Sequence, residues 1–272
     1  MIGNRQKIFD AHTHVYPPSL APRAVGALGR FYDFVPQGDG TVAELLRDGK
    51  QPRDGFLLLA VATNAQQVRR VNEYVVQAAN EAREKGKTTL CFAGMHQDCP
   101  DMAEELQHAI DCGAVGMKLH PDIQGADIDD RRFYPAYELL QQYDLPLCLH
   151  MGDDRERYRY SEPGKLRRML KDFPHLRVLA SHFGGYRAQI EVKEQLLPLD
   201  NLWYDTSSSL WYLAPEAAQD MARSIPEDRL LFGSDYPVMT LDRELAYFER
   251  LGLKDRQREM VLWDNAAAFL RF

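Results

Sequence analysis

The sequence predicts a single-domain (β/α)8 TIM barrel over residues 1–272, with an extra C-terminal helix, and three observations support this prediction. Short apolar segments alternate with longer amphipathic segments, which is typical of βαβ units and a parallel sheet. Eight such units follow one another, and eight units close a barrel. The chain has 272 residues, of which 45% are hydrophobic. That is enough for one large core without a second domain.

The expected strands are short apolar segments, and each ends near a polar residue. They lie at Lys7–Val15, Gly55–Thr63, Thr88–His96, Val115–Pro121, Leu145–Gly152, Leu176–Gly184, Asn201–Ser207 and Arg229–Pro237. An open, doubly wound sheet of eight strands is the alternative that the same alternation leaves open.

The segments between these strands are rich in Glu, Lys, Arg, Gln and Ala, as exposed helices are. Helices are expected at Ala65–Lys85, Met102–Cys112, Arg132–Tyr143, Pro163–Asp172, Tyr186–Leu197 and Pro215–Ser224. Two more are expected after the last strand, at Asp242–Leu251 and Asp255–Leu270. The long segment Tyr16–Gly40, after the first strand, is expected to be a loop that serves as a lid.

Polar side chains gather where the strands end. The clusters are Asp10–His14, Gly94–His96, Lys118–His120, His150–Asp153, Ser181–His182, Asp205–Ser207 and Gly233–Asp235. In a (β/α)8 barrel the C-terminal ends of the strands share one rim, and that rim carries the active site. Six of the eight histidines, all except His108 and His175, are expected there.

Composition excludes several classes of function. The formal net charge is −7, and the arginines are scattered, so a nucleic-acid partner is not expected. No apolar segment is long enough to cross a membrane. The polar Met1–Lys7 segment does not resemble a signal peptide. The four cysteines form no CxxC motif, so the expected compartment is the cytoplasm.

His12 and His14 are two residues apart on the first expected strand, so both imidazoles point to the same face. Neutral imidazole is a good ligand for zinc and similar metals. An isolated pair of this kind is weak evidence, because two partly exposed histidines at a strand end would give the same pattern.

Further ligand types end other strands and strengthen the metal hypothesis. His150 ends strand five, His182 ends strand six and Asp235 ends strand eight. Three histidines and one carboxylate suffice to hold a catalytic divalent cation while leaving positions open. The expected ligands are therefore His12, His14, His150 and Asp235, and His182 is a further ligand or a proton carrier.

Five motifs together resemble the amidohydrolase superfamily. They are Asp10-Ala11-His12-Thr13-His14 on strand one, Gly116-Met117-Lys118-Leu119-His120-Pro121 on strand four, a histidine on each of strands five and six, and Gly233-Ser234-Asp235-Tyr236-Pro237 on strand eight. The closest branch is that of TIM-barrel metal-dependent hydrolases, which also holds aminocarboxymuconate-semialdehyde decarboxylase. The resemblance implies the same four ligands, with His182 in a catalytic or second ligand position.

Strand four leaves the number of metal ions open. Binuclear members of the superfamily carry a bridging Glu or carboxylated Lys there, and this chain offers Lys118 and His120 on one face and no Glu. Lys118 could be carboxylated, but an ordinary ammonium that binds an anionic substrate is the favoured interpretation. One or two divalent ions are therefore expected, with zinc as the first choice.

The expected reaction is hydrolysis of a small amide, ester or lactone by a metal-activated water. Asp235 would act as ligand and base, and His182 would stabilise the developing oxyanion. Substrate contacts are expected from Lys118, His120, Arg155, Tyr236 and Trp211, of which Tyr236 could instead only pack against the rim. The expected partner is a small molecule, and homodimerisation stays open.

Three other functions fit the same sequence. A metal-dependent nonoxidative decarboxylase of a small aromatic or dienic acid would use the same ligands, with Arg155 or Lys118 binding the carboxylate that leaves. A lactonase could keep the barrel and the histidines without a metal. A non-catalytic ligand-binding barrel is the alternative outside the enzymes, and the intact ligand set argues against it.

Overall fold

The computed structural model describes residues 5–272, so most of the polar segment Met1–Lys7 lies outside the described residues. Eight parallel strands pair in the order β1 to β8 and confirm the predicted barrel. The strands are β1 Phe9–Thr13, β2 Gly55–Leu59, β3 Thr88–Gly94, β4 Met117–Leu119, β5 Leu147–Leu149, β6 Val178–Ala180, β7 Leu202–Asp205 and β8 Leu230–Leu231. Each lies inside its predicted range but is shorter, because the polar residues at the rim leave the ladder.

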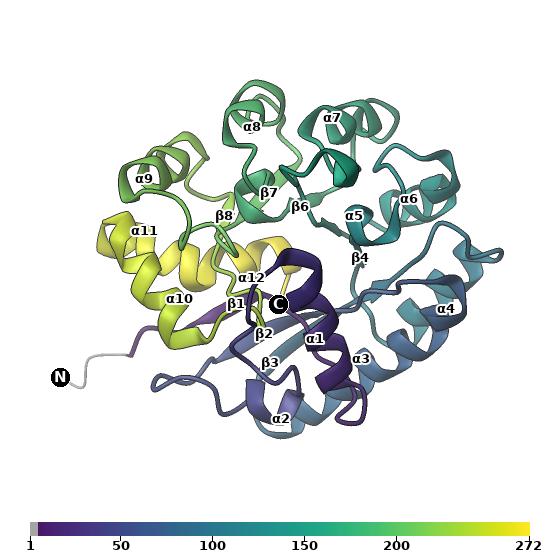
Figure 1. The fold of residues 1–272 in the computed structure, drawn as a ribbon, viewed down its shortest axis with the longest axis horizontal. Coiled ribbons are helices and arrows are strands. Elements are labelled where there is room, and N and C mark those ends of the chain that lie inside the picture. The colour runs from purple at the N-terminus through teal and green to yellow at the C-terminus, as the bar shows by residue number, and fades with distance from the viewer. Residues whose placement is uncertain (1–4) are drawn as a thin grey trace.

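Helices surround the strands (Figure 1). They are α1 Ala21–Tyr32, α2 Val42–Leu45, α3 Val68–Glu84, α4 Met102–Asp111, α5 Pro121–Gln124, α6 Tyr134–Gln142, α7 Pro163–Asp172, α8 Gln189–Gln195, α9 Pro215–Ser224, α10 Leu241–Phe248, α11 Asp255–Glu259 and α12 Asn265–Leu270. All eight predicted helical segments contain helix. Among residues 5–272, no helix combines the length and apolar character needed to cross a bilayer.

Two predicted segments differ from the structure. Tyr16–Gly40 was expected to be a loop, yet it contains α1, a helix of 12 residues that begins with proline at one of its first two positions, where proline is well tolerated. The segment Asp255–Leu270 is not one α-helix, because a π-helical turn at Met260–Asp264 separates α11 from α12. There the Val261 carbonyl accepts a hydrogen bond from the Phe232 amide at 3.0 Å, so the irregular turn ties this segment to the end of β8.

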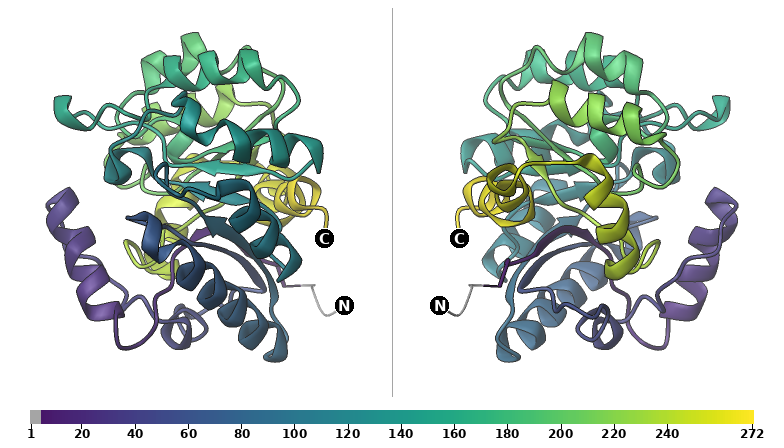
Figure 2. Two further views of the ribbon diagram at one scale, coloured as in Figure 1. Left: turned by 90° about the vertical axis from the view of Figure 1, so that its right-hand side faces the viewer. Right: turned by 90° about the vertical axis from the view of Figure 1, so that its left-hand side faces the viewer.

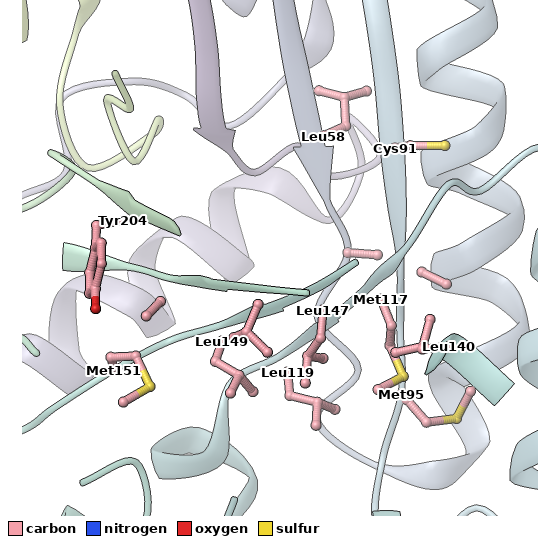
Figure 3. Packing of buried hydrophobic residues seen from close by; sticks show 14 of the residues in the cluster. Leu58, Cys91, Met95, Met117, Leu119, Leu140, Leu147, Leu149, Met151 and Tyr204 are labelled. Carbon is pink, nitrogen blue, oxygen red and sulfur yellow. The ribbon is translucent and has the colours of Figure 1, made fainter. Parts of the chain in front are cut away.

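The strands bury both of their faces, as parallel strands in a barrel do. The outward face packs against the helices, and Figure 3 shows members of this cluster, among them Leu58, Met117 and Leu149 from strands and Leu140 from α6. The second cluster fills the lumen and joins the C-terminal helix. Its fully or nearly buried members are Phe9, Ala11, Leu57, Leu59, Phe92, Cys148, Leu179, Leu231, Ala266, Phe269 and Leu270. The predicted extra helix thus packs against the lumen residues.

A bulge in β1 decides which of its residues enter the lumen. Asp10 pairs with Phe56 and Thr13 with Leu58, so three steps along β1 match two along β2. An extra residue in one strand shifts the alternation of its side chains. Phe9 therefore lies in the lumen cluster, and His12, three residues later, also points inward, where its ring meets Lys118 of β4.

The barrel closes between β8 and β1 just below the rim. The Ala11 amide donates to the Phe232 carbonyl at 2.8 Å, and the Asp235 amide donates to the His12 carbonyl at 2.9 Å. Buried Asp10 reinforces this seam, since it accepts from the Ser234 amide at 2.9 Å and forms an ion pair with buried Arg53 at 2.8 Å. The seam therefore fixes His12 and Asp235 relative to one another.

Glu244 on α10 is fully buried, and neither of its carboxylate oxygens has a hydrogen-bond partner in the described part of the chain. Burial raises the pKa of Glu244 well above its ordinary value of 4.5, and the negative charges of Asp10, Asp235 and Asp205 add to the rise. The folded protein therefore binds this proton more tightly than the unfolded chain does.

We expect Glu244→Gln to change how stability depends on pH. Above pH 4.5 the unfolded chain releases this proton and the folded protein keeps it, so wild-type stability falls by about 1.4 kcal/mol per pH unit until the folded pKa is reached. The always-neutral Gln removes that loss, so the variant should gain stability relative to wild type as the pH rises above 4.5. Urea unfolding at several pH values measures this, with exposed Glu216→Gln as control. A stability difference that stays constant with pH would contradict the expectation.

Candidate active site

The residues predicted from the strand ends meet at one end of the barrel. His12, His14, His96, His120, His150 and His182 are all buried. His12 and His14 come from β1 and its extension, and Asp235 comes from the segment after β8. Gly233 permits this meeting, because a Cβ there would lie 2.9 Å from the Cβ of His12. A glycine is therefore required where the chain after β8 approaches β1.

Three potential ligand atoms face one another at the centre of this end. The Nε2 atoms of His12 and His14 are 3.2 Å apart. An oxygen of Asp235 lies 3.4 Å from the first and 3.5 Å from the second. Ligands placed tetrahedrally at the zinc–nitrogen distance would be separated by about 3.3–3.4 Å. The three separations therefore fit one shared divalent cation.

The hydrogen bonds on the far sides of the two rings orient the potential ligand atoms. The Nδ1 atom of His14 lies 2.9 Å from the Leu59 carbonyl oxygen, which can only accept a hydrogen bond, so this nitrogen carries the proton. The Nδ1 atom of His12 lies 2.9 Å from a carboxylate oxygen of Asp205 and also donates. Each neutral ring has one protonated nitrogen, so both Nε2 atoms present lone pairs to each other and to Asp235.

The pKa shifts in this group have the direction that metal ligands need. Burial lowers the pKa of His12 to about 4, and the Lys118 ammonium adds to this effect, so the ring is neutral at pH 7. Burial by itself would raise the pKa of Asp235, but the neighbouring histidines outweigh it and hold the pKa well below its usual range. The neutral imidazole of His12 and the ionised carboxylate of Asp235 can bind a cation without first losing protons.

Asp205 at the end of β7 orients His12 and was not among the predicted site residues. Its second carboxylate oxygen accepts from the His182 amide at 3.0 Å and from the Ser207 amide at 3.1 Å. Burial opposes ionisation, but His12 outweighs it and the pKa of Asp205 lies well below its usual range. Such carboxylate–histidine pairs fix the ring orientation of metal ligands.

His182 and His150 form the next layer of the site. The Nδ1 atom of His182 lies 3.0 Å from the Ser207 carbonyl oxygen, so its Nε2 carries the lone pair, and this atom lies 2.9 Å from Nδ1 of His150. The two rings therefore link the centre of the site to its wall. The structure groups His12 with His14 and Asp235 and also with His182 and Asp205, but it groups His150 with His120 and Asp122. The role of His150 as fourth ligand stays a prediction.

The group of His120, Asp122 and His150 is poorly arranged for a second cation. The two imidazole rings are stacked with centroids 3.8 Å apart and planes 11° apart. Lone pairs of imidazole lie in the ring plane, so those of two parallel rings run side by side and do not converge on one ion. The Tyr32 hydroxyl faces both rings instead, 2.9 Å from Nε2 of His120 and 3.1 Å from Nε2 of His150.

Lys118 lies beneath the central group and is fully buried. Its Nζ is 3.4 Å from Nε2 of His12, and it is 3.5 Å from the Cys148 sulfur and 3.5 Å from the Ser181 hydroxyl. Over residues 5–272, no carboxylate forms an ion pair with it. A buried ammonium without a counter-ion is costly, so this side chain is suited to an anionic group brought by a ligand.

Two of the other predicted substrate-binding residues, Arg155 and Tyr236, already form hydrogen bonds within the protein. Arg155 donates to Asp153 through two of its nitrogens, at 2.9 and 2.6 Å, and through the third to the Phe31 carbonyl. The Tyr236 hydroxyl contacts the segment after α1, including Glu44 at 2.8 Å. The Tyr236 hydroxyl is thus engaged by that segment, and its contact with a substrate stays a prediction.

Trp211, the remaining predicted substrate residue, lies in the turn after β7. Its ring meets Tyr212 edge-on with centroids 5.6 Å apart. Tyr212 in turn contacts Tyr186, and Tyr186 lies 6.3 Å from the His182 ring. A chain of aromatic contacts therefore joins Trp211 to the histidines, and its contact with a substrate stays a prediction.

The sequence contained a signal for some of the residues that were missed. Asp205 ends a strand as the other site residues do, and the position alone does not separate an orienting carboxylate from a ligand. Asp122 follows the histidine of strand four by two residues. Tyr32 had no such signal, because it lies on a helix that reaches the site only through the tertiary fold.

Comparison with known proteins places the chain in a family and finds solved structures with a similar fold. Residues 9–272 match the family described as Amidohydrolase. An uncharacterised TIM-barrel protein from Bordetella bronchiseptica is 22% identical, with 97% of this chain and 98% of that chain covered and a TM-score of 0.76. A 2,6-dihydroxybenzoate decarboxylase bound to 2,6-dihydroxybenzoate is 16% identical, with 98% and 100% covered and a TM-score of 0.73.

A further solved structure of this fold contains a metal. It is 5-carboxyvanillate decarboxylase from Novosphingobium aromaticivorans, in complex with manganese and 4-hydroxy-3-methoxy-5-nitrobenzoic acid. It is 14% identical, with 99% of this chain and 98% of that chain covered and a TM-score of 0.70. Among curated proteins, none matches the chain significantly.

We expect Asp205→Asn to lower the affinity for a divalent cation about 10- to 100-fold, the usual effect of removing a carboxylate that orients a ligand histidine. The amide can no longer accept a strong hydrogen bond from His12 and leaves its ring free to turn. Competition titration with a chelating dye, with Zn²⁺ and with Mn²⁺, measures the affinity. Asp154→Asn, on the exposed rim, serves as control. If Asp205→Asn and wild type bind the cation with equal affinity, Asp205 does not orient a metal ligand.

Proposed function

The chain belongs to the amidohydrolase family, and we propose that it is a metal-dependent decarboxylase of a small aromatic acid. The observation that carries this proposal is Lys118, a buried ammonium 3.4 Å from His12 with no carboxylate partner in the described chain. A substrate carboxylate would supply the missing negative charge next to the proposed cation. Two of the structures of similar fold are decarboxylases of hydroxylated benzoic acids, which supports the choice of substrate class.

The residues at the centre would hold one divalent cation. His12, His14 and Asp235 present the ligand atoms, with His150 proposed as a fourth ligand. The cation would act as a Lewis acid that polarises a substrate oxygen. Zinc suits the nitrogen and oxygen ligands, and manganese is the metal named in the 5-carboxyvanillate decarboxylase structure, so both belong in the test.

The protein side chains would carry the other requirements of decarboxylation. Lys118 would pair with the carboxylate that leaves. When the bond between ring carbon and carboxylate breaks, its electron pair stays on the ring carbon, which must then gain a proton while carbon dioxide departs. That proton would come from solvent water, and Asp235 and His182 are proposed to relay it, because Nδ1 of His182 donates to the Ser207 carbonyl at 3.0 Å and leaves the lone pair of Nε2 to accept a proton and pass it on.

Hydrolysis of an amide, ester or lactone is the second candidate, and one observation favours it. The ionised carboxylate of Asp235 lies 3.4 Å from Nε2 of His12 and 3.5 Å from Nε2 of His14, so it could accept a proton from a water held between these groups. Arg155 would not be available to bind a substrate carboxylate unless it left Asp153 and Phe31. The two reactions differ in their products, so one assay panel separates them.

We expect purified protein to contain a divalent metal and to release carbon dioxide from hydroxybenzoic acids, with activity lost on chelation and regained with Zn²⁺ or Mn²⁺. Asp235→Asn should lower turnover on the order of 10³-fold or more while the far-UV circular dichroism stays unchanged. Elemental analysis and carbon dioxide detection measure these outcomes, with Asp154→Asn as the surface control. Proton release from esters or lactones without carbon dioxide would assign the site to hydrolysis instead.

We expect Lys118→Met to lower kcat/KM for a carboxylate substrate by about 10- to 100-fold, the loss typical of a charged hydrogen bond. The Tm should not fall, since the substitution replaces an unpaired buried charge with an apolar side chain of similar length. Steady-state kinetics and thermal unfolding measure the two effects. If activity falls only in proportion to a lower Tm, Lys118 has a structural role and the proposal loses its main support.

A further inference from the structure

Helix α1 has few contacts with the rest of the molecule. Of its 12 residues, only Ala21 and Gly29 are buried, and the flanking Leu20 and Val35 are exposed. Figure 2 shows α1 at the end of the molecule opposite to the two termini, standing apart from the ring of helices. A helix of this length with so little buried surface cannot be held in place by apolar packing alone.

The two ends of the segment that contains α1 are firmly attached. The Tyr16 amide donates to the Gly40 carbonyl at 2.8 Å, and the Gly38 amide donates to the Pro237 carbonyl at 3.0 Å. The Tyr236 hydroxyl accepts from the Gly40 amide at 3.1 Å. Helix α1 could therefore move while both ends of its segment stay attached to the barrel. The contacts at the C-terminal end of α1 then determine the position of the helix.

Arg155 joins both residues at the C-terminal end of α1 to the segment after β5. The Arg155 guanidinium lies over the rings of Phe31 and Tyr32 from α1, at 4.6 and 5.2 Å, and over Tyr158 at 4.3 Å. It also donates to the Phe31 carbonyl, near the C-terminal end of the helix. Its other nitrogens donate to Asp153, a buried carboxylate that holds the guanidinium in this plane. Arginine thus links α1 to the segment after β5 by stacking and by hydrogen bonding.

The link places one residue of α1 directly on the site. The Tyr32 hydroxyl lies 2.9 Å from Nε2 of His120 and 3.1 Å from Nε2 of His150. Its ring is 5.9 Å from the His150 ring and 6.3 Å from that of Tyr186. In this position Tyr32 covers the pair of stacked histidines and separates them from solvent.

We propose that α1 is a lid over the active site, that Arg155 is the latch that keeps it closed, and that Tyr32 is the residue by which the closed lid covers His120 and His150. The latch is polar and lies near the rim, so it can break while the barrel stays folded. Substrate reaches the histidines when Arg155 releases Phe31 and Tyr32. The lid closes again when the guanidinium returns to these partners. This device is independent of which reaction the site catalyses.

The rate at which diethyl pyrocarbonate modifies each histidine tests the lid, because the reagent must reach the ring. Peptide mass spectrometry resolves His120 and His150 from exposed His175, which is the reference within each sample. In Arg155→Gln we expect His120 and His150 to react at least fivefold faster than in wild type, with His175 unchanged. Arg157→Gln is the matched control, since Arg157 belongs to the same segment but stacks only on Tyr158. It should react as wild type does.

Two further variants separate the latch from a general loss of structure. Arg155→Lys keeps the charge but not the planar fork, so it should restore little of the protection. Tyr32→Phe keeps the stacked ring and loses only the hydroxyl, so it should react faster than wild type but more slowly than Arg155→Gln. Hydrogen exchange of α1 amides should quicken in Arg155→Gln while that of α3 stays the same. Equal modification rates in Arg155→Gln and wild type would overturn the proposal, and so would faster exchange throughout the protein.

Discussion

The site depends on one electrostatic constraint. The Nε2 atoms of two imidazoles and one carboxylate lie close together in a buried space. His12 and His14 cannot turn their lone pairs away, because Asp205 and the Leu59 carbonyl oxygen hold the opposite nitrogens. The two Nε2 atoms lie 3.2 Å apart, and the Lys118 ammonium lies 3.4 Å from that of His12. The proposed divalent cation would be held between these atoms, and the buried hydrogen bonds keep the candidate ligands oriented toward it.

Local features of the barrel bring His12, His14 and Asp235 close together. The bulge in β1 brings His12 and His14 into the lumen, and the ion pair of Asp10 with Arg53 stabilises the seam where β8 meets β1. Gly233 lets the chain that carries Asp235 approach His12 closely. Both the bulge and the glycine are needed for this arrangement. A regular β1 strand, or a larger residue at position 233, would displace a candidate ligand atom.

The environment of the central group limits the chemistry it can perform. Lys118 lies below it as a buried side chain, and the rings of Tyr32 and Tyr186 lie beside the neighbouring His150 and His182. An aromatic acid satisfies both features, because its ring meets aromatic side chains and its carboxylate meets the ammonium. A neutral ester satisfies the first and leaves the charge unpaired. This difference makes decarboxylation the better-supported proposal for a family whose name describes hydrolysis.

The sequence by itself determined the barrel, the order of its strands and the end at which the polar residues gather. These properties follow from the alternation of apolar and amphipathic segments and from residues at strand ends, which are local patterns. The pairing of His12 with His14 was also predictable, because their spacing on a strand places both on one face. The helix within 16–40 was not predicted, since the prolines and the length of this segment were interpreted as those of a loop.

Only the tertiary structure decided which polar residues act together. Asp205 orients His12 across 193 positions of sequence, and Tyr32 reaches His120 across 88. Arg155, expected to bind a carboxylate of the substrate, has its nitrogens engaged by Asp153 and Phe31. Distances between side chains on separate strands depend on strand register, on the bulge in β1 and on the path of α1. Those features arise from packing of the whole chain, so no local pattern encodes them.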